Sequence, residues 1–193
     1  MIGLLGLIAA LCSTSAAGDE IPQSAIVRFN TVCTNCHEGE CSGRLSFSSG
    51  AAAARQHMQR YLGPIVDADV AAFFGLLRYI KENCAHYPQP GRIPDSGIWT
   101  AADLDEWRNP DSGAYFIALG HLATGDYRLR LSFASHDQGR LKITDRHFEP
   151  LLEAELSQGA DQELTFTAMA GAHYLTLQGQ TRLTGMALIT SAR

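Results

Sequence analysis

The sequence predicts an α+β protein in two segregated domains, a small all-α domain followed by an all-β antiparallel sandwich. In residues 18–88 the apolar side chains recur every three or four positions, which is the spacing of one buried helix face. In residues 97–193 they alternate with polar side chains, which is typical of half-buried strands. Residues 89–96 lie between these halves, and their prolines and glycine favour a linker.

Residues 1–17 have the features of a cleaved signal peptide. Residues 2–11 are an unbroken run of Ile, Gly, Leu and Ala, long enough for the apolar core of a leader but too short to span a membrane. Small residues at positions 15–17 fit a cleavage site, although no Lys or Arg precedes the apolar run. A lipid anchor on Cys12 is the alternative, and the bulky Leu11 before it argues against one. We therefore expect a periplasmic or secreted protein.

The composition is that of a folded, mildly acidic protein. The 193 residues are 46% apolar and 18% charged, a balance that disordered chains lack. The formal net charge of -5 argues against nucleic acid as a partner, because proteins that bind it usually carry a basic face. After the leader, no segment is apolar enough to be a transmembrane segment.

Three helices are predicted in the first half. The strongest spans residues 67–84, where an aspartate can cap the start and apolar side chains share one face. Residues 51–62 are rich in alanine and are followed by a Gly-Pro pair, which stops a helix. A weaker candidate spans residues 23–31, just ahead of the cysteines.

The second half carries seven short strand patterns separated by turn signals. Residues 126–133 show the clearest alternation of polar and apolar side chains. Gln138-Gly139 and Gln158-Gly159 are among the turn signals. Short antiparallel strands with frequent turns predict a sandwich. The other candidate strands are residues 115–119, 140–144, 151–156, 163–168, 173–177 and 185–190.

Cys33-Thr34-Asn35-Cys36-His37 is a C-x-x-C-H motif, the attachment site of a c-type haem. Two thiols on adjacent helical turns can add across the two vinyl groups of one porphyrin, and the next histidine then lies beneath the iron. A zinc site would need a second matched pair of ligands, and none follows at a suitable spacing. A thioredoxin-like dithiol would need alternating strands and helices, which this half lacks. The motif therefore predicts one covalently attached haem c.

Residues 24–84 resemble a single-haem cytochrome c domain. In that family an N-terminal helix leads into the C-x-x-C-H motif and a final amphipathic helix closes the fold, as the predicted helices do here. The resemblance implies thioether links from Cys33 and Cys36, with His37 as the proximal ligand of the iron. It covers about a third of the chain.

The sixth ligand of the iron is open between His57 and Met58. Neighbouring residues point about 100° apart on a helix, so only one of them can face the iron. Met58 would raise the reduction potential, whereas His57 would give bis-histidine ligation and a lower potential. Residues 56–63 resemble a run in some small exported cytochromes in which the histidine recurs, and this favours His57. His86 is a third candidate, placed after the last predicted helix.

Cys41 and Cys84 are predicted to form a disulfide. Of the five cysteines, Cys12 leaves with the leader and two hold the haem, so these two thiols remain. Disulfides persist in an oxidising compartment outside the cytoplasm. The bond would tie the segment after the haem motif to the end of the last predicted helix.

The predicted β domain shows no catalytic constellation. Trp99 and Trp107 flank an acidic stretch, where they could line a carbohydrate or protein surface or close the end of the core. Residues 125–131 resemble the G-x-Y-x-L-x-L strand of exported β-sandwich accessory domains, carbohydrate-binding ones included, which implies a fold rather than a ligand. The histidines are scattered one per strand or turn, which favours scaffold or surface positions: His121, His136, His147 and His173.

Together these features predict an exported monohaem c-type cytochrome that transfers single electrons between redox protein partners. The β domain would dock or position the haem domain. The protein is expected to be an electron carrier rather than an enzyme, with the iron supplying the chemistry and the protein setting its potential. Two alternatives stay open: a haem enzyme or sensor with an open sixth site, and a carbohydrate- or partner-binding module that carries a haem domain.

Overall fold

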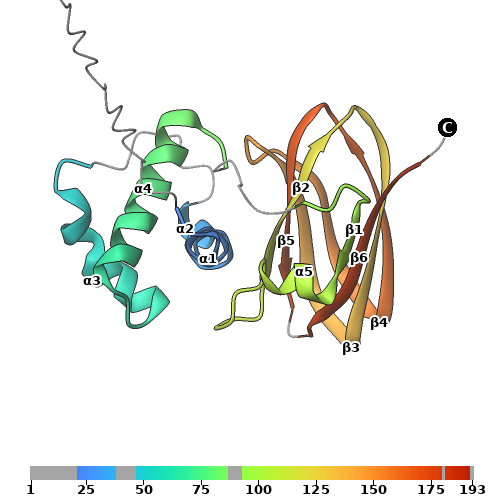
Figure 1. Cartoon of the computed structure of the whole chain (residues 1–193), viewed down its shortest axis with the longest axis horizontal. Coiled ribbons are helices and arrows are strands. Elements are labelled where there is room, and N and C mark those ends of the chain that lie inside the picture. Colours follow the sequence, from blue (N-terminus) through green and yellow to red (C-terminus); the bar gives the residue numbers. More distant parts are fainter. Residues whose placement is uncertain (1–20, 38–46, 87–92, 180, 192–193) are drawn as a thin grey trace, which may run out of the picture.

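The computed structural model describes residues 21–37, 47–86, 93–179 and 181–191. The predicted signal peptide lies outside these residues. In Figure 1 the helices within residues 23–83 lie together beside one side of the β-sheet, nearest to strands β2 (Tyr115–Leu122) and β5 (Gly171–Gln178). The short helix α5 (Ala101–Asp105) lies against the sheet itself. No helix in the described ranges is long and apolar enough to cross a membrane.

The first helical segments follow one another without a break. The predicted helix over residues 23–31 is confirmed and continues through the cysteine motif. The Thr31 and Thr34 hydroxyls donate to carbonyl oxygens four residues earlier, each at 2.7 Å, which lets polar side chains sit inside the helix. The segments are α1 (Gln23–Arg28), the π-helical turn η1 (Phe29–Cys33) and α2 (Thr34–His37).

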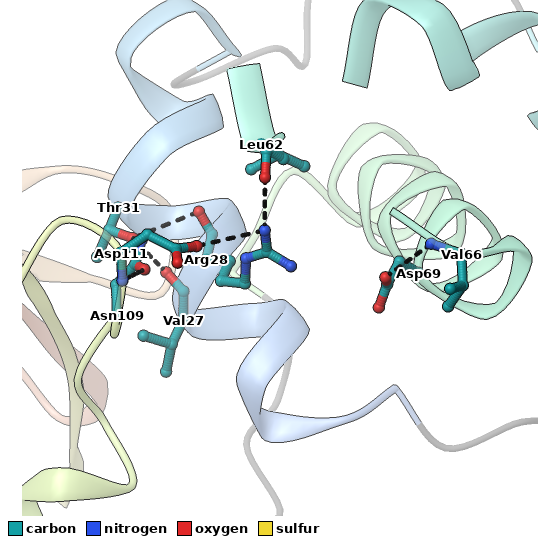
Figure 2. Close-up of polar contacts among 8 residues, drawn as sticks. All are labelled: Val27, Arg28, Thr31, Leu62, Val66, Asp69, Asn109 and Asp111. Carbon is teal, nitrogen blue, oxygen red and sulfur yellow. Dashed lines mark hydrogen bonds and ion pairs between the residues drawn. The ribbon is translucent and has the colours of Figure 1, made fainter. Parts of the chain in front are cut away.

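The two longer helices, α3 (Gly50–Leu62) and α4 (Asp67–Asn83), agree with the predicted ranges to within one residue. The φ angle of +73° at Gly63 ends α3, a conformation that favours glycine. The Asp69 carboxylate accepts a hydrogen bond from the backbone N–H of Val66 at 3.1 Å and so caps the start of α4 (Figure 2). The two helices pack against each other.

Six strands form one antiparallel sheet within the described residues. Its order is β1-β6-β3-β5-β2, and β4 also pairs with β3. A short helix, α5 (Ala101–Asp105), follows the first strand. The strands are β1 (Ile98–Thr100), β2 (Tyr115–Leu122), β3 (Gly125–Asp145), β4 (Pro150–Ala168), β5 (Gly171–Gln178) and β6 (Leu183–Thr190).

The glycines at 139 and 159, which predict strand ends, lie inside long strands. Both fall at register shifts within the β3–β4 pair, so the chain bulges there and does not turn. Gly139 is required for another reason, because a Cβ at this position would lie 2.2 Å from the carbonyl oxygen of Gln178. The prediction of several short strands in these regions is therefore wrong.

The register shifts divide β3 into two halves with different partners. Residues 127–133 pair with β6 and residues 140–145 with β5, while β4 accompanies both halves. The true turn between β3 and β4 follows Asp145. The Asp145 carboxylate accepts hydrogen bonds from the backbone N–H groups of His147, at 2.7 Å, and Glu149, at 3.0 Å.

One apolar core runs through the helices and the sheet. Ile26 and Phe29 from the first helical segment belong to the same buried cluster as Phe116 and Ile117 from β2. None of these four side chains is more than 1% exposed. The helices therefore bury apolar side chains against the sheet as well as against one another.

Polar side chains cross the same boundary (Figure 2). The Asn109 amide donates a hydrogen bond of 2.8 Å to the Thr31 hydroxyl, and both side chains are buried. The Arg28 guanidinium donates to the carbonyl oxygen of Leu62 at 2.8 Å and forms an ion pair of 3.4 Å with Asp111. The contacts with Asn109 and Asp111 fix the first helical segments to the loop between α5 and β2, and the contact with Leu62 fixes α1 to α3.

The predicted fold class, a small all-α cytochrome c-like domain segregated from a β-sandwich, is therefore wrong. The described chain is mainly antiparallel β-sheet with a few short helices, and the helices do not form a separate all-α domain. Just before the predicted linker, the backbone N–H of His86 donates to the carbonyl oxygen of Arg146 at 2.8 Å. The periodicity of apolar residues predicts where the helices lie in the sequence, but it does not predict which part of the protein each helix packs against.

Candidate functional site

A cavity of about 290 Å³ lies among the helices, beside the cysteine motif. Its walls come from η1, α2, α3, α4 and the irregular chain just before α3. Most of its lining side chains are apolar, and the aromatic ones are Phe29, Phe47, Tyr61, Phe73 and Phe74. A mostly apolar cavity with a few polar groups is the usual form of a cofactor site.

Cys33 and Cys36 both line this cavity, and they are not joined by a disulfide. Cys33 is half-buried at the end of η1, and Cys36 is exposed on α2. Burial raises the pKa of Cys33 to about 11, with Arg28 opposing the rise and Cys36 adding to it. Cys33 is therefore a protonated thiol at neutral pH, which makes it a poor nucleophile.

The remaining predicted residues near the motif are described only in part. His37 is the last residue of α2, directly after Cys36, but its side chain lies outside the described part of the structure. Cys84 takes part in a disulfide. Its predicted partner, Cys41, lies outside the described residues, so the pairing of these two cysteines stays a prediction.

Both candidates for the sixth ligand line the same cavity. Met58 is 6% exposed, whereas His57 is exposed and its ring centroid lies 5.1 Å from that of Tyr61. The third candidate, His86, lies elsewhere, against the β-sheet. The helices therefore bring the two cysteines of the motif and the two favoured ligand candidates around one space.

Phe47 is a wall residue that sequence reasoning missed. Its ring meets that of Phe74 edge to face, with the centroids 5.0 Å apart, and the Lys81 amine lies 5.2 Å from the Phe47 centroid. Phe74 belongs to the apolar pattern of the helix predicted over residues 67–84. No local pattern marks Phe47, because it lies in irregular chain before α3.

The chemistry of the lining fits a haem. Two thiols are available for covalent attachment, and an imidazole or a thioether is available for the iron. The aromatic and aliphatic side chains offer an apolar surface to a flat porphyrin. Within the described residues, no group of three or more His, Cys, Asp or Glu side chains is arranged to hold a bare metal ion.

The tryptophans of the β part do not form a binding surface. Trp99 and Trp107 are each 1% exposed, so both belong to the core. His173 is also 1% exposed, whereas His121 on the neighbouring strand is exposed. The expectation of scaffold or surface positions holds for these two histidines.

Two solved structures are weakly similar to this chain. The sequence matches no protein-family profile and no curated protein. A family 35 carbohydrate binding module from an environmental isolate is 9% identical with a TM-score of 0.31, over 42% of this chain and 72% of that one. A family GH115 4-O-methyl-α-glucuronidase with specificity for decorated arabinogalactans is 12% identical with a TM-score of 0.35, over 76% of this chain and 24% of that one. At this level of similarity neither neighbour identifies a function.

Proposed function

We propose that this protein is an exported haem c protein that transfers single electrons between redox protein partners. One observation carries the proposal: both cysteines of the C-x-x-C-H motif and both favoured iron ligands line the same apolar cavity. The leader-like start of the sequence supports export, and covalent attachment would keep the haem bound outside the cytoplasm.

The residues of the motif would hold the haem through three bonds. The S–H groups of Cys33 and Cys36 would add across the two vinyl double bonds, which needs no oxidant and gives two thioethers. His37 would ligate the iron. The bound haem supplies an iron centre that gains or loses one electron. Phe29 and Phe73, each no more than 1% exposed, would exclude water from the porphyrin and so help to set its potential.

Co-expression of the full chain with a c-type cytochrome maturation system tests the attachment. We expect the mass of one haem on each chain after denaturation, and no added mass for the Cys33→Ser/Cys36→Ser variant, because no thiol remains to form the bond. Mass spectrometry of the denatured protein measures this directly. The Cys84→Ser variant, which removes a cysteine outside the motif, should keep its haem. A folded wild-type chain recovered without haem would contradict the proposal.

Matched variants at adjacent positions test the sixth ligand. The His57→Ala variant of the haem-loaded protein should give a high-spin ferric spectrum, because the iron loses its second imidazole, while Met58→Leu should stay low-spin. Optical spectra of the ferric and ferrous forms measure both. A high-spin spectrum for Met58→Leu together with a low-spin spectrum for His57→Ala would identify Met58 as the sixth ligand. A high-spin spectrum in the wild type would instead favour the haem enzyme or sensor with an open sixth site.

The β-sheet part would dock or position the haem-carrying helices. Two contacts support this role, the buried hydrogen bond between Asn109 and Thr31 and the ion pair between Arg28 and Asp111. They fix the helices to the loop that leads into strand β2. A partner that binds the sheet would therefore also hold the haem in a fixed orientation. The two tryptophans that could have lined a carbohydrate surface, Trp99 and Trp107, are each 1% exposed, which counts against the carbohydrate-binding alternative.

A further inference from the structure

A second cavity, of about 150 Å³, lies where the end of α4 meets the sheet. Its walls come from α4, the chain that follows it, β2, β5 and the turn after β3. No Asp or Glu is among the described residues that line it. A cavity with several hydrogen-bond donors and a positive charge but no carboxylate favours an anion. Its polar side chains are Tyr79, His86, His121, Arg146, His173 and Tyr174.

His173 offers this cavity a buried nitrogen with no partner. The side chain is 1% exposed, and its Nδ1 lies 2.8 Å from the carbonyl oxygen of Gly171. A carbonyl oxygen only accepts hydrogen bonds, so the Nδ1 atom carries the hydrogen and, in the neutral ring, the Nε2 atom carries the lone pair. Nε2 has no hydrogen-bond partner among the described residues.

His86 offers a second such nitrogen. This side chain is 7% exposed, its Nε2 lies 3.3 Å from the Thr144 hydroxyl oxygen, and its Nδ1 has no partner within the described chain. Because the Thr144 hydroxyl can donate to Nε2, the ring is able to present an N–H at Nδ1. A buried polar atom without a hydrogen-bond partner lowers the stability of the protein. A ligand that pairs with both imidazoles removes this cost, and its binding free energy is therefore more favourable than with exposed groups, which already bond to water.

Arg146 supplies the charge at the mouth of the cavity. It is exposed, and no carboxylate of the described residues forms an ion pair with it. Burial raises the pKa of Tyr174 to about 12, with Tyr79 adding to the rise and Arg146 opposing it. The Tyr174 phenol therefore keeps its hydrogen at neutral pH and can donate it.

We propose that this cavity binds a small oxyanion, a carboxylate or a phosphate, with Arg146 as its charge partner and His86 and His173 as its buried donors. His173 must be protonated to donate from Nε2. In the free protein, burial lowers the pKa of His173, and His121 lowers it further, against the opposing effects of the Gly171 carbonyl and Asp145. A bound anion favours the imidazolium, so binding takes up a proton and strengthens as the pH falls from neutral.

Calorimetric titration of the mature full chain with inorganic phosphate and with acetate tests the proposal. We expect saturable binding of at least one of these anions, and the one that binds identifies the ligand class. The Arg146→Ala variant should weaken this binding about 10-fold or more, because a charge-assisted contact is lost. Arg140→Ala is the matched control, since Arg140 lies on β3, outside the cavity, and pairs with Glu155 at 3.0 Å.

Proton uptake separates a binding role of His173 from a purely structural one. Titration with the anion that binds, in buffers of different ionisation enthalpy, should show proton uptake for the wild type and none beyond that of the anion itself for His173→Gln. The Arg146→Ala variant should still take up a proton on binding, but it should bind more weakly. The proposal is overturned if neither anion binds saturably, or if Arg146→Ala and Arg140→Ala bind equally well. It does not depend on whether the protein carries a haem.

Discussion

Replacing Phe29 by alanine is expected to lower the free energy of unfolding of the whole protein by about 3–5 kcal/mol. The side chain is fully buried, so its removal leaves a void that the packed surroundings fill only in part. Phe29 lies on η1, which contacts β2 and β5 as well as α3. The helices and the sheet should therefore lose stability together.

Two signals can be followed during denaturation by urea. Far-ultraviolet circular dichroism reports on the helices, and fluorescence reports on the sheet, because Trp99 and Trp107 are the two tryptophans of the chain. The midpoints of both unfolding transitions should shift to lower urea concentration by the same amount. Met169→Ala, at a side chain that is 66% exposed, is the control and should shift neither. A shift of the circular dichroism midpoint without a shift of the fluorescence midpoint would contradict this expectation.

Acidification below pH 6.5 is expected to destabilise the protein through His86, at about 1.4 kcal/mol per pH unit. Burial and, to a smaller extent, the positive charge of Lys142 together lower the pKa of His86 from 6.5 to about 3. The unfolded chain takes up a proton near pH 6.5, whereas the folded protein does so only near pH 3. Stability is therefore fully present above pH 6.5 and falls as the pH is lowered through this window.

Urea unfolding at several pH values, in buffers without phosphate or acetate, measures this effect. In the His86→Leu variant the slope of stability against pH should be smaller, because the titrating group is gone while an apolar side chain still contacts Phe148 and Tyr174. Met169→Ala, at an exposed side chain that carries no titratable group, should keep the slope of the wild type. Equal slopes in the wild type and His86→Leu would show that His86 does not carry the effect.

The elements that the sequence predicts correctly are those whose signals are local. Residues 51–62 and 67–84 form helices within one residue of the expected bounds, because helix periodicity and the Gly63 stop act over a few positions. The contact that joins the helices to the sheet is not local, since Thr31 and Asn109 lie 78 positions apart. No pattern within a short window could predict it, and the fold class was wrong for that reason.

The same distinction applies to the sites. The C-x-x-C-H motif and the candidate ligands His57 and Met58 on the second predicted helix point to one location, and these two residues line one cavity together with Cys33 and Cys36. Phe47 completes that wall without any sequence signal. The second cavity combines segments from α4 to β5, so no motif marks it. Gly139 was misleading as a turn signal, because this glycine lets the backbone of β3 approach that of Gln178 closely and does not form a turn.

The long strand β4 has a consequence for how the protein behaves in concentrated solution. Among the described residues β4 pairs only with β3, so its other edge is unpaired, and such an edge is a template for a second chain. Acidic side chains occupy this strand at Glu153, Glu155 and Glu163. A hydrogen bond from Arg130, at 2.6 Å, lowers the pKa of Glu163, which therefore stays ionised in mild acid. Each of these carboxylates forms an ion pair with a basic side chain of β3, namely Lys142, Arg140 and Arg130 in turn. A second chain pairing with this edge would have to cover these charged pairs, which disfavours aggregation through β4.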